Sequence, residues 1–151
     1  MHILIGTDGS DDAIYAAKRG VATLAPATAI TVVCAVDTIS AETAGMESGF
    51  GGGIASPDEL DAERNAVIAH ARDALQRTVA AVDTDATIDE RVVEGDAGWA
   101  LCRVADEVGA DVVVVGSRGR GAIKRALLGS VSTHVVHQAP CAVLVVRAGV
   151  S

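Results

Sequence analysis

Glycine and serine residues that could cradle a phosphate lie in one segment of this chain, between Gly116 and Ser130. Gly116 and Gly119 lack a Cβ, so they can take backbone angles and close approaches that turn amide groups towards an anion. Gly129 and Ser130 precede a helical pattern, and the unpaired N–H groups at the start of a helix favour phosphate. The spacing therefore predicts a phosphate-binding loop.

Positive charge is concentrated in the same segment. It contains four bases and no acid between Ser117 and Ser130, namely Arg118, Arg120, Lys124 and Arg125. The whole chain has a formal net charge of -8, so this segment is a positive island in an acidic protein. A glycine-rich turn and a solvated basic face remain alternative interpretations. The segment does not contain the P-loop pattern, and no G-x-G-x-x-G dinucleotide pattern follows the first strand.

Four other residues are weaker candidates for a functional role. Asp8 lies in an Asp-Gly-Ser sequence, which on local grounds is a turn that caps the first helix. His134 and His137 lack a third ligand for a metal, so we interpret them as ordinary helix residues. Trp99 is interpreted as a packing residue.

Composition limits the classes of protein to consider. Hydrophobic residues make up 50% of the chain and aromatic residues only 2%, which is typical of buried parallel strands covered by helices. The acidic balance argues against nonspecific binding to nucleic acid or anionic lipid. We expect no membrane span, because no apolar run reaches about 18 residues. The first residues do not resemble a secretion signal, so we expect a cytoplasmic protein.

The elements that must position these residues alternate along the chain. Short runs rich in β-branched residues predict strands at 3–6, 29–36, 86–93, 111–115 and 142–146. Helical periodicity predicts helices after Ser10, from a capping box at Ser56 with a stripe from Leu60 to Val79, after Asp96, and after a Ser130 cap. The three cysteines are interpreted as small core residues. They are Cys34, Cys102 and Cys141.

This alternation predicts a single α/β domain over residues 1–151. We expect a doubly wound, five-stranded parallel sheet in the order 3-2-1-4-5, with helices on both faces. Its ligand site is expected at the carboxyl ends of the first and fourth strands, where Asp8 and Gly116 can meet one ligand. The glycine-rich stretch 38–56 is either a ligand lid or a mobile crossover loop.

The spacing of the glycine segment resembles the ATP-binding signature of the universal stress protein family, G-2x-G-9x-G-[ST]. The first strand, which ends in Asp8 and is followed by Ser10, is similar to the opening of that family. Ala139-Pro140-Cys141 resembles its entry into the last strand, with proline and cysteine in the other order. The likeness runs over the full length of the chain.

The resemblance implies which residues form an adenine nucleotide site. Thr7 and Asp8 belong to it, with Asp8 bonded to the ribose or near the adenine, and the backbone around Val36 meets the adenine edge. The glycine loop wraps the ribose and phosphates, and the residues after it bind phosphate through amides and hydroxyls. The loop residues are Gly116, Arg118 and Gly119, and those after it are Gly129, Ser130, Val131 and Ser132.

The function implied is an ATP-binding sensor or regulator of the stress response, acting through nucleotide-dependent conformation or an unidentified protein partner. ATP could be replaced by AMP or ADP, and Mg²⁺ is expected to bridge the phosphates. The alternatives are a slow ATPase or nucleotidyl-transfer enzyme, for which no clear general base is visible near the loop, and a dimeric scaffold without nucleotide. A homodimer through the uncharged last strand, 142–146, is also expected.

Overall fold

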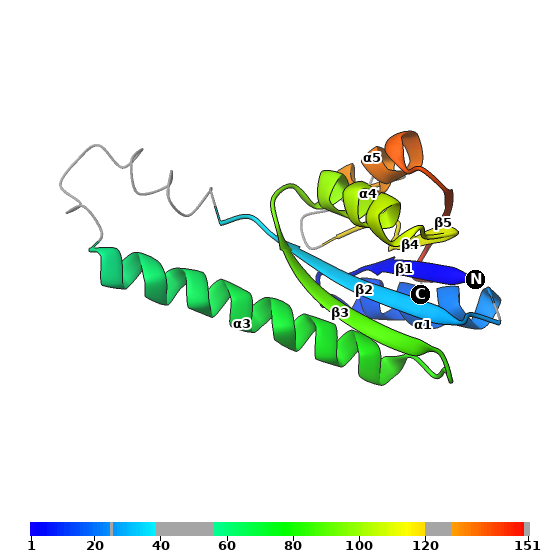
Figure 1. The fold of residues 1–151 in the computed structure, drawn as a ribbon, viewed down its shortest axis with the longest axis horizontal. Coiled ribbons are helices and arrows are strands. Elements are labelled where there is room, and N and C mark those ends of the chain that lie inside the picture. The colour runs from blue at the N-terminus through cyan, green and yellow to red at the C-terminus, as the bar shows by residue number, and fades with distance from the viewer. Residues whose placement is uncertain (25, 39–55, 120–127, 150–151) are drawn as a thin grey trace.

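The structure is a computed structural model that describes residues 1–24, 26–38, 56–119 and 128–149. Five strands form one sheet in the order β3-β2-β1-β4-β5, and every neighbouring pair is parallel (Figure 1). The strands are β1 (His2–Gly6), β2 (Ala29–Val36), β3 (Thr87–Glu94), β4 (Val112–Gly116) and β5 (Ala142–Val146). The predicted strand order is confirmed, and the predicted strand ends differ by one residue or less.

Helices cover both faces of the sheet, as a doubly wound fold requires. The helices of the described residues are α1 (Asp11–Thr23), α3 (Pro57–Ala81), α4 (Ala97–Val108) and α5 (Ser130–Gln138). Figure 1 shows α1 and α3 on one side of the sheet and α4 and α5 on the other. None of these helices is both long and apolar enough to cross a membrane.

Alternation along the strands divides the core into two layers. On β1, Ile3 and Ile5 pack towards α1 and α3, while Leu4 packs towards α4 and α5. All three are fully buried. Cys34 and Cys102 are buried as predicted, and burial raises the pKa of the Cys102 thiol, which disfavours its reactive thiolate form.

Local capping defines where most helices begin. The Ser10 hydroxyl accepts the Ala13 N–H at 3.2 Å at the start of α1. At the start of α3, Ser56 and Glu59 form the predicted capping box, and hydrogen bonds from the Ser56 N–H and hydroxyl lower the pKa of the Glu59 carboxyl. Asp96 caps α4 through the Trp99 N–H, at 3.0 Å. Three of the four described helices therefore have a side-chain cap.

The first half of α3 departs from the predicted buried stripe. Residues 57–66 are all exposed, including Leu60, because this part of the helix extends past the sheet (Figure 1). Further along, Ala71, Ala74 and Leu75 are buried against β2 and α1. Helical periodicity identified the face of α3 but not where the sheet beneath it ends.

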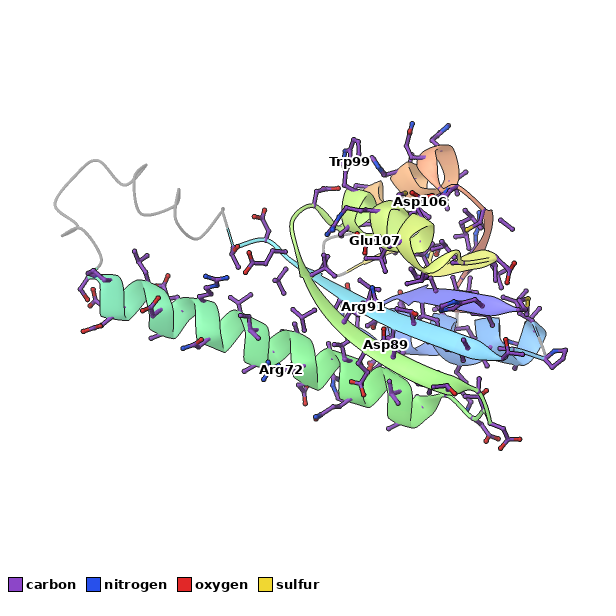
Figure 2. The ribbon with its side chains drawn as sticks, in the orientation of Figure 1. Arg72, Asp89, Arg91, Trp99, Asp106 and Glu107 are labelled. Carbon is purple, nitrogen blue, oxygen red and sulfur yellow. The ribbon has the colours of Figure 1, made fainter. Side chains whose placement is uncertain are left out.

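Trp99 lies at the surface. Its side chain is 70% exposed on the outer side of α4, as Figure 2 shows. Its only described ring contact is with His134 of α5, at 5.8 Å between ring centroids. Trp99 therefore packs on α5 through one ring contact only and leaves most of its surface in solvent. Most of the glycine-rich stretch 38–56, together with Arg120, Lys124 and Arg125, lies outside the described residues.

Candidate functional site

A cavity of about 330 Å³ lies at the carboxyl ends of β1, β2 and β4. Cavities of this size are typical of small-molecule and cofactor sites. Its walls also include the first turns of α1, α4 and α5. The lining residues are Gly6, Thr7, Asp8, Ala13, Val33, Ala35, Ala97, Leu101, Val115, Gly116, Arg118, Gly119, Gly129, Ser130, Val131 and Ser132.

Nearly all of the predicted site residues meet at this cavity. Thr7 and Asp8 lie at the end of β1, and the two parts of the glycine segment lie at the end of β4 and the start of α5. Val36 is the exception. Its side chain is buried on the face covered by α1 and α3, and its carbonyl accepts the Gly95 N–H at 2.9 Å.

One wall of the cavity is apolar and was not predicted from sequence. It is formed by Val33, Ala35, Ala97, Leu101 and Val115. Successive side chains of a strand point to opposite faces, so Val33 and Ala35 of β2 face the cavity and Val36 does not. Two-residue alternation along β2 was the available signal for this wall.

The turn after β1 presents Asp8 to the cavity. Asp8 Oδ1 accepts the Ser10 N–H at 2.9 Å and the Ser10 hydroxyl at 2.5 Å. Ser10, and not Asp8, caps α1. Asp8 Oδ2 faces Gly119 on the opposite side, because a Cβ placed on Gly119 would lie 3.3 Å from it. The capping turn and the position at the cavity are therefore compatible.

The Thr7 hydroxyl bonds to the protein. It accepts the Gly9 N–H at 3.1 Å and lies 2.8 Å from the hydroxyl of Thr78 on α3. Thr78 donates its own proton to the Ala74 carbonyl, at 2.7 Å. The Thr7 hydroxyl is therefore the donor to Thr78, and Thr7 contributes to the cavity without offering this proton to a ligand.

The glycines of the loop provide space and not unusual backbone angles. Gly116, Gly119 and Gly129 all have φ outside the left-handed region. A Cβ on Gly116 would approach the Arg118 carbonyl to 3.3 Å, and one on Gly119 would project towards Asp8. A Cβ on Gly129 would have only ordinary contacts, the nearest at 3.5 Å. The unusual backbone angles that glycine allows are therefore not used at these three positions.

The start of α5 differs from that of the other described helices. Gly129 occupies the cap position, Ser130 is the first helical residue, and no side chain caps the helix. The prediction that Ser130 caps α5 was wrong. The buried Ser132 hydroxyl lies 3.0 Å from the Gly129 carbonyl and 3.2 Å from that of Ser117, so it joins α5 to the glycine loop. Within the part of the chain that the structure describes, no side chain accepts a hydrogen bond from the first amides of α5, which lie beside the cavity.

Charge at the cavity is mixed. Among the lining residues, Asp8 provides a carboxylate and Arg118 a guanidinium. The uncapped start of α5 adds the partial positive charge of a helix N-terminus. The site thus combines an apolar wall, a carboxylate and an end that carries positive charge.

Comparison with known proteins gives a consistent result. The model of the universal stress protein family matches residues 1–147. A relative from Staphylococcus epidermidis, which bears the name universal stress protein, is 30% identical to this chain over 151 residues. The match covers 97% of this chain and 83% of that protein. A universal stress protein of Synechocystis is 47% identical over 53 residues, 35% of this chain and 34% of that protein. A solved universal stress protein in complex with cAMP is 30% identical, with a TM-score of 0.60, and covers 97% of this chain and 96% of that chain.

Proposed function

This chain belongs to the universal stress protein family, and from that premise we propose that its cavity binds an adenine nucleotide. We propose ATP as the principal ligand, with AMP or ADP as alternatives, and Mg²⁺ bridging the phosphates. The bound nucleotide regulates the conformation of this cytoplasmic protein or its binding to a protein partner in the stress response.

The observation that carries the proposal is the uncapped start of α5. Ser130, Val131 and Ser132 all line the cavity, and their helix has no side-chain cap, in contrast to the other described helices. Helix N–H groups need a partner, and a phosphate supplies oxygen atoms where the dipole favours negative charge. Arg118 adds positive charge at the same end.

The rest of the cavity suits a nucleoside. The apolar wall around Val33 and Leu101 offers a surface for a purine ring. Asp8 in its ionised form only accepts hydrogen bonds, so it pairs with a donor such as a ribose hydroxyl or the adenine amino group. The relative solved with cAMP, at 30% identity, supports an adenine nucleotide as the ligand class.

We propose that the protein retains the nucleotide and does not turn it over rapidly. Phosphoryl transfer needs an oriented attacking group as well as charge stabilisation. Asp8 is the carboxylate among the described lining residues, and one of its oxygens is bonded to Ser10. Binding that stabilises ground state and transition state equally does not accelerate a reaction.

We expect the purified protein to bind ATP in equilibrium dialysis, more strongly with Mg²⁺ than with EDTA, and to release an adenine nucleotide when it is heated. Released molecules can be identified by mass and absorbance. Phosphate release with excess ATP and Mg²⁺ should stay well below about one per second. Absence of binding to ATP, ADP, AMP and cAMP at millimolar concentration would refute the proposal. Sustained turnover above about one per second would favour the enzyme alternative.

We also propose a homodimer through β5. All five residues of this edge strand are apolar and none is fully buried, whereas the opposite edge, β3, carries Asp89, Glu90, Arg91 and Glu94. Uncharged edges offer unpaired backbone groups to another strand. Two β5 edges paired about a two-fold axis give a closed assembly.

Light scattering is expected to give about twice 15.2 kDa for the wild type. Val145→Lys should shift the protein to the monomer, because it places a charge in the unprotected edge strand. The matched control is Ile88→Lys on β3, which changes an equally half-buried residue of the other edge and should leave the dimer intact. Thermal unfolding of both variants must show that they fold. A monomeric wild type, or a dimer lost equally in both variants, contradicts the β5 interface.

A further inference from the structure

Helix α3 contributes no residue to the cavity lining, yet it binds the turn that presents Asp8. Three α3 residues on one helix face, Ala74, Arg77 and Thr78, contact this turn. Thr78 bonds to the Thr7 hydroxyl at 2.8 Å, before Asp8 in the chain. On the other side of Asp8 in the chain, Arg77 Nη2 donates to the Gly9 carbonyl at 2.8 Å. The residue between these two attachments is Asp8.

The Arg77 guanidinium is itself oriented. Its Nε donates to Asp73 Oδ2 at 3.0 Å, one helical turn earlier on α3. The planar guanidinium thus bonds a carboxylate and the Gly9 carbonyl at the same time, which a lysine cannot reproduce with the same geometry. Close packing completes the attachment, because Gly9 lies directly against Ala74.

We propose that Arg77 is a positioning residue of the nucleotide site, which holds the Gly9 carbonyl and thereby sets where the Asp8 carboxylate lies in the cavity. The inference rests on the proposed nucleotide function. The Ser10 N–H bonds Asp8 Oδ1, and the attachments of the turn to α3 hold the residues on either side of Asp8, Thr7 and Gly9. Arg77 acts through Asp8 and does not touch the ligand.

The test combines ATP affinity with a double-mutant cycle. Arg77→Ala should weaken ATP binding about tenfold, within the usual range of coupling between residues in one hydrogen-bond network. In an Asp8→Asn background the same change should have little effect, because Arg77 acts through the carboxylate. Arg77→Lys should restore part of the affinity. The matched control is Arg72→Ala on the same helix, an exposed arginine outside this contact (Figure 2), which should leave ATP affinity unchanged.

A second readout needs no nucleotide. The Ser10 N–H donates to Asp8 Oδ1, so its hydrogen exchange reports how firmly the turn is held. Exchange should be faster in Arg77→Ala than in the wild type and unchanged in Arg72→Ala.

The outcomes separate this inference from the proposed function. If the wild type binds no adenine nucleotide, the proposed function fails and the positioning role fails with it, whatever the exchange rates. If the wild type binds ATP but Arg77→Ala retains full affinity, only the positioning role is overturned. The positioning role is also overturned if Arg77→Ala lowers ATP affinity by the same factor in the wild-type and Asp8→Asn backgrounds. It is overturned as well if the hydrogen exchange of the Ser10 N–H is the same in Arg77→Ala and the wild type. If Asp8→Asn abolishes ATP binding, the double-mutant cycle cannot be measured and the exchange of the Ser10 N–H decides alone. An exchange rate in Arg77→Ala equal to that of the wild type would then overturn the positioning role.

Discussion

A Gly119→Val protein is expected to bind ATP about a hundredfold more weakly than the wild type, while it unfolds at nearly the same temperature. Gly119 is exposed at the cavity, its φ lies outside the left-handed region, and Asp8 Oδ2 is the neighbour of any added Cβ. Valine is therefore compatible with the backbone but fills space that the ligand needs. Overpacking costs about 1–3 kcal/mol, and each 1.4 kcal/mol changes affinity about tenfold.

The matched control is Gly149→Val. A Cβ at this glycine meets nothing within 4 Å, and the residue does not line the cavity. Its ATP affinity in calorimetry should equal that of the wild type. If Gly119→Val keeps full affinity and remains folded, the nucleotide does not occupy the space between Asp8 and the glycine loop.

The second large effect concerns stability. Gly9→Ala is expected to lower the free energy of unfolding by about 4 kcal/mol, through about 1–2 kcal/mol of left-handed backbone strain and about 1–3 kcal/mol of overpacking. Gly9 has φ +74°, and an added Cβ would lie 2.6 Å from the Cβ of Ala74. The temperature of unfolding should fall by about 10 °C.

Gly109→Ala isolates the backbone part of this effect. Gly109 ends α4 with φ +62°, but nothing lies within 4 Å of an added Cβ. Denaturation should therefore show a loss of only about 1 kcal/mol for Gly109→Ala. Equal losses of unfolding free energy in Gly9→Ala and Gly109→Ala would mean that the contact between Gly9 and α3 is not tight. That result would also count against the proposed positioning role of Arg77.

Much of the fold could be predicted because local patterns and global topology agree. Runs such as Val32 to Cys34 are apolar because they are buried on both faces, as is typical of parallel sheets. Capping residues such as Ser10, Ser56 and Asp96 identified helix starts, since their side chains bond amides within the next turn. These interactions are short in sequence, so they are visible without the tertiary structure.

Predictions were wrong where the outcome depends on distant neighbours. Periodicity placed Leu60 in a buried stripe, but α3 is longer than the sheet beneath it. The sequence did not indicate how much of Trp99 is buried, and α4 turns most of it towards solvent. Local sequence suggested Ser130 as a cap, whereas the structure uses Gly129 and leaves α5 uncapped. None of these outcomes can be obtained from residues adjacent in the chain.

The candidate site shows the same division. Residue types and spacing by themselves determined that Asp8 and the glycine segment follow neighbouring strands, because the carboxyl ends of parallel strands meet at one edge of a sheet. Only the tertiary structure decided which face of β2 lines the cavity, placing Val33 and Ala35 there and Val36 in the core. It also decided that Arg77 reaches the Gly9 carbonyl, a contact between residues 68 positions apart. Such contacts depend on how helices pack onto the sheet, and packing depends on the shapes of side chains that are far apart in the sequence.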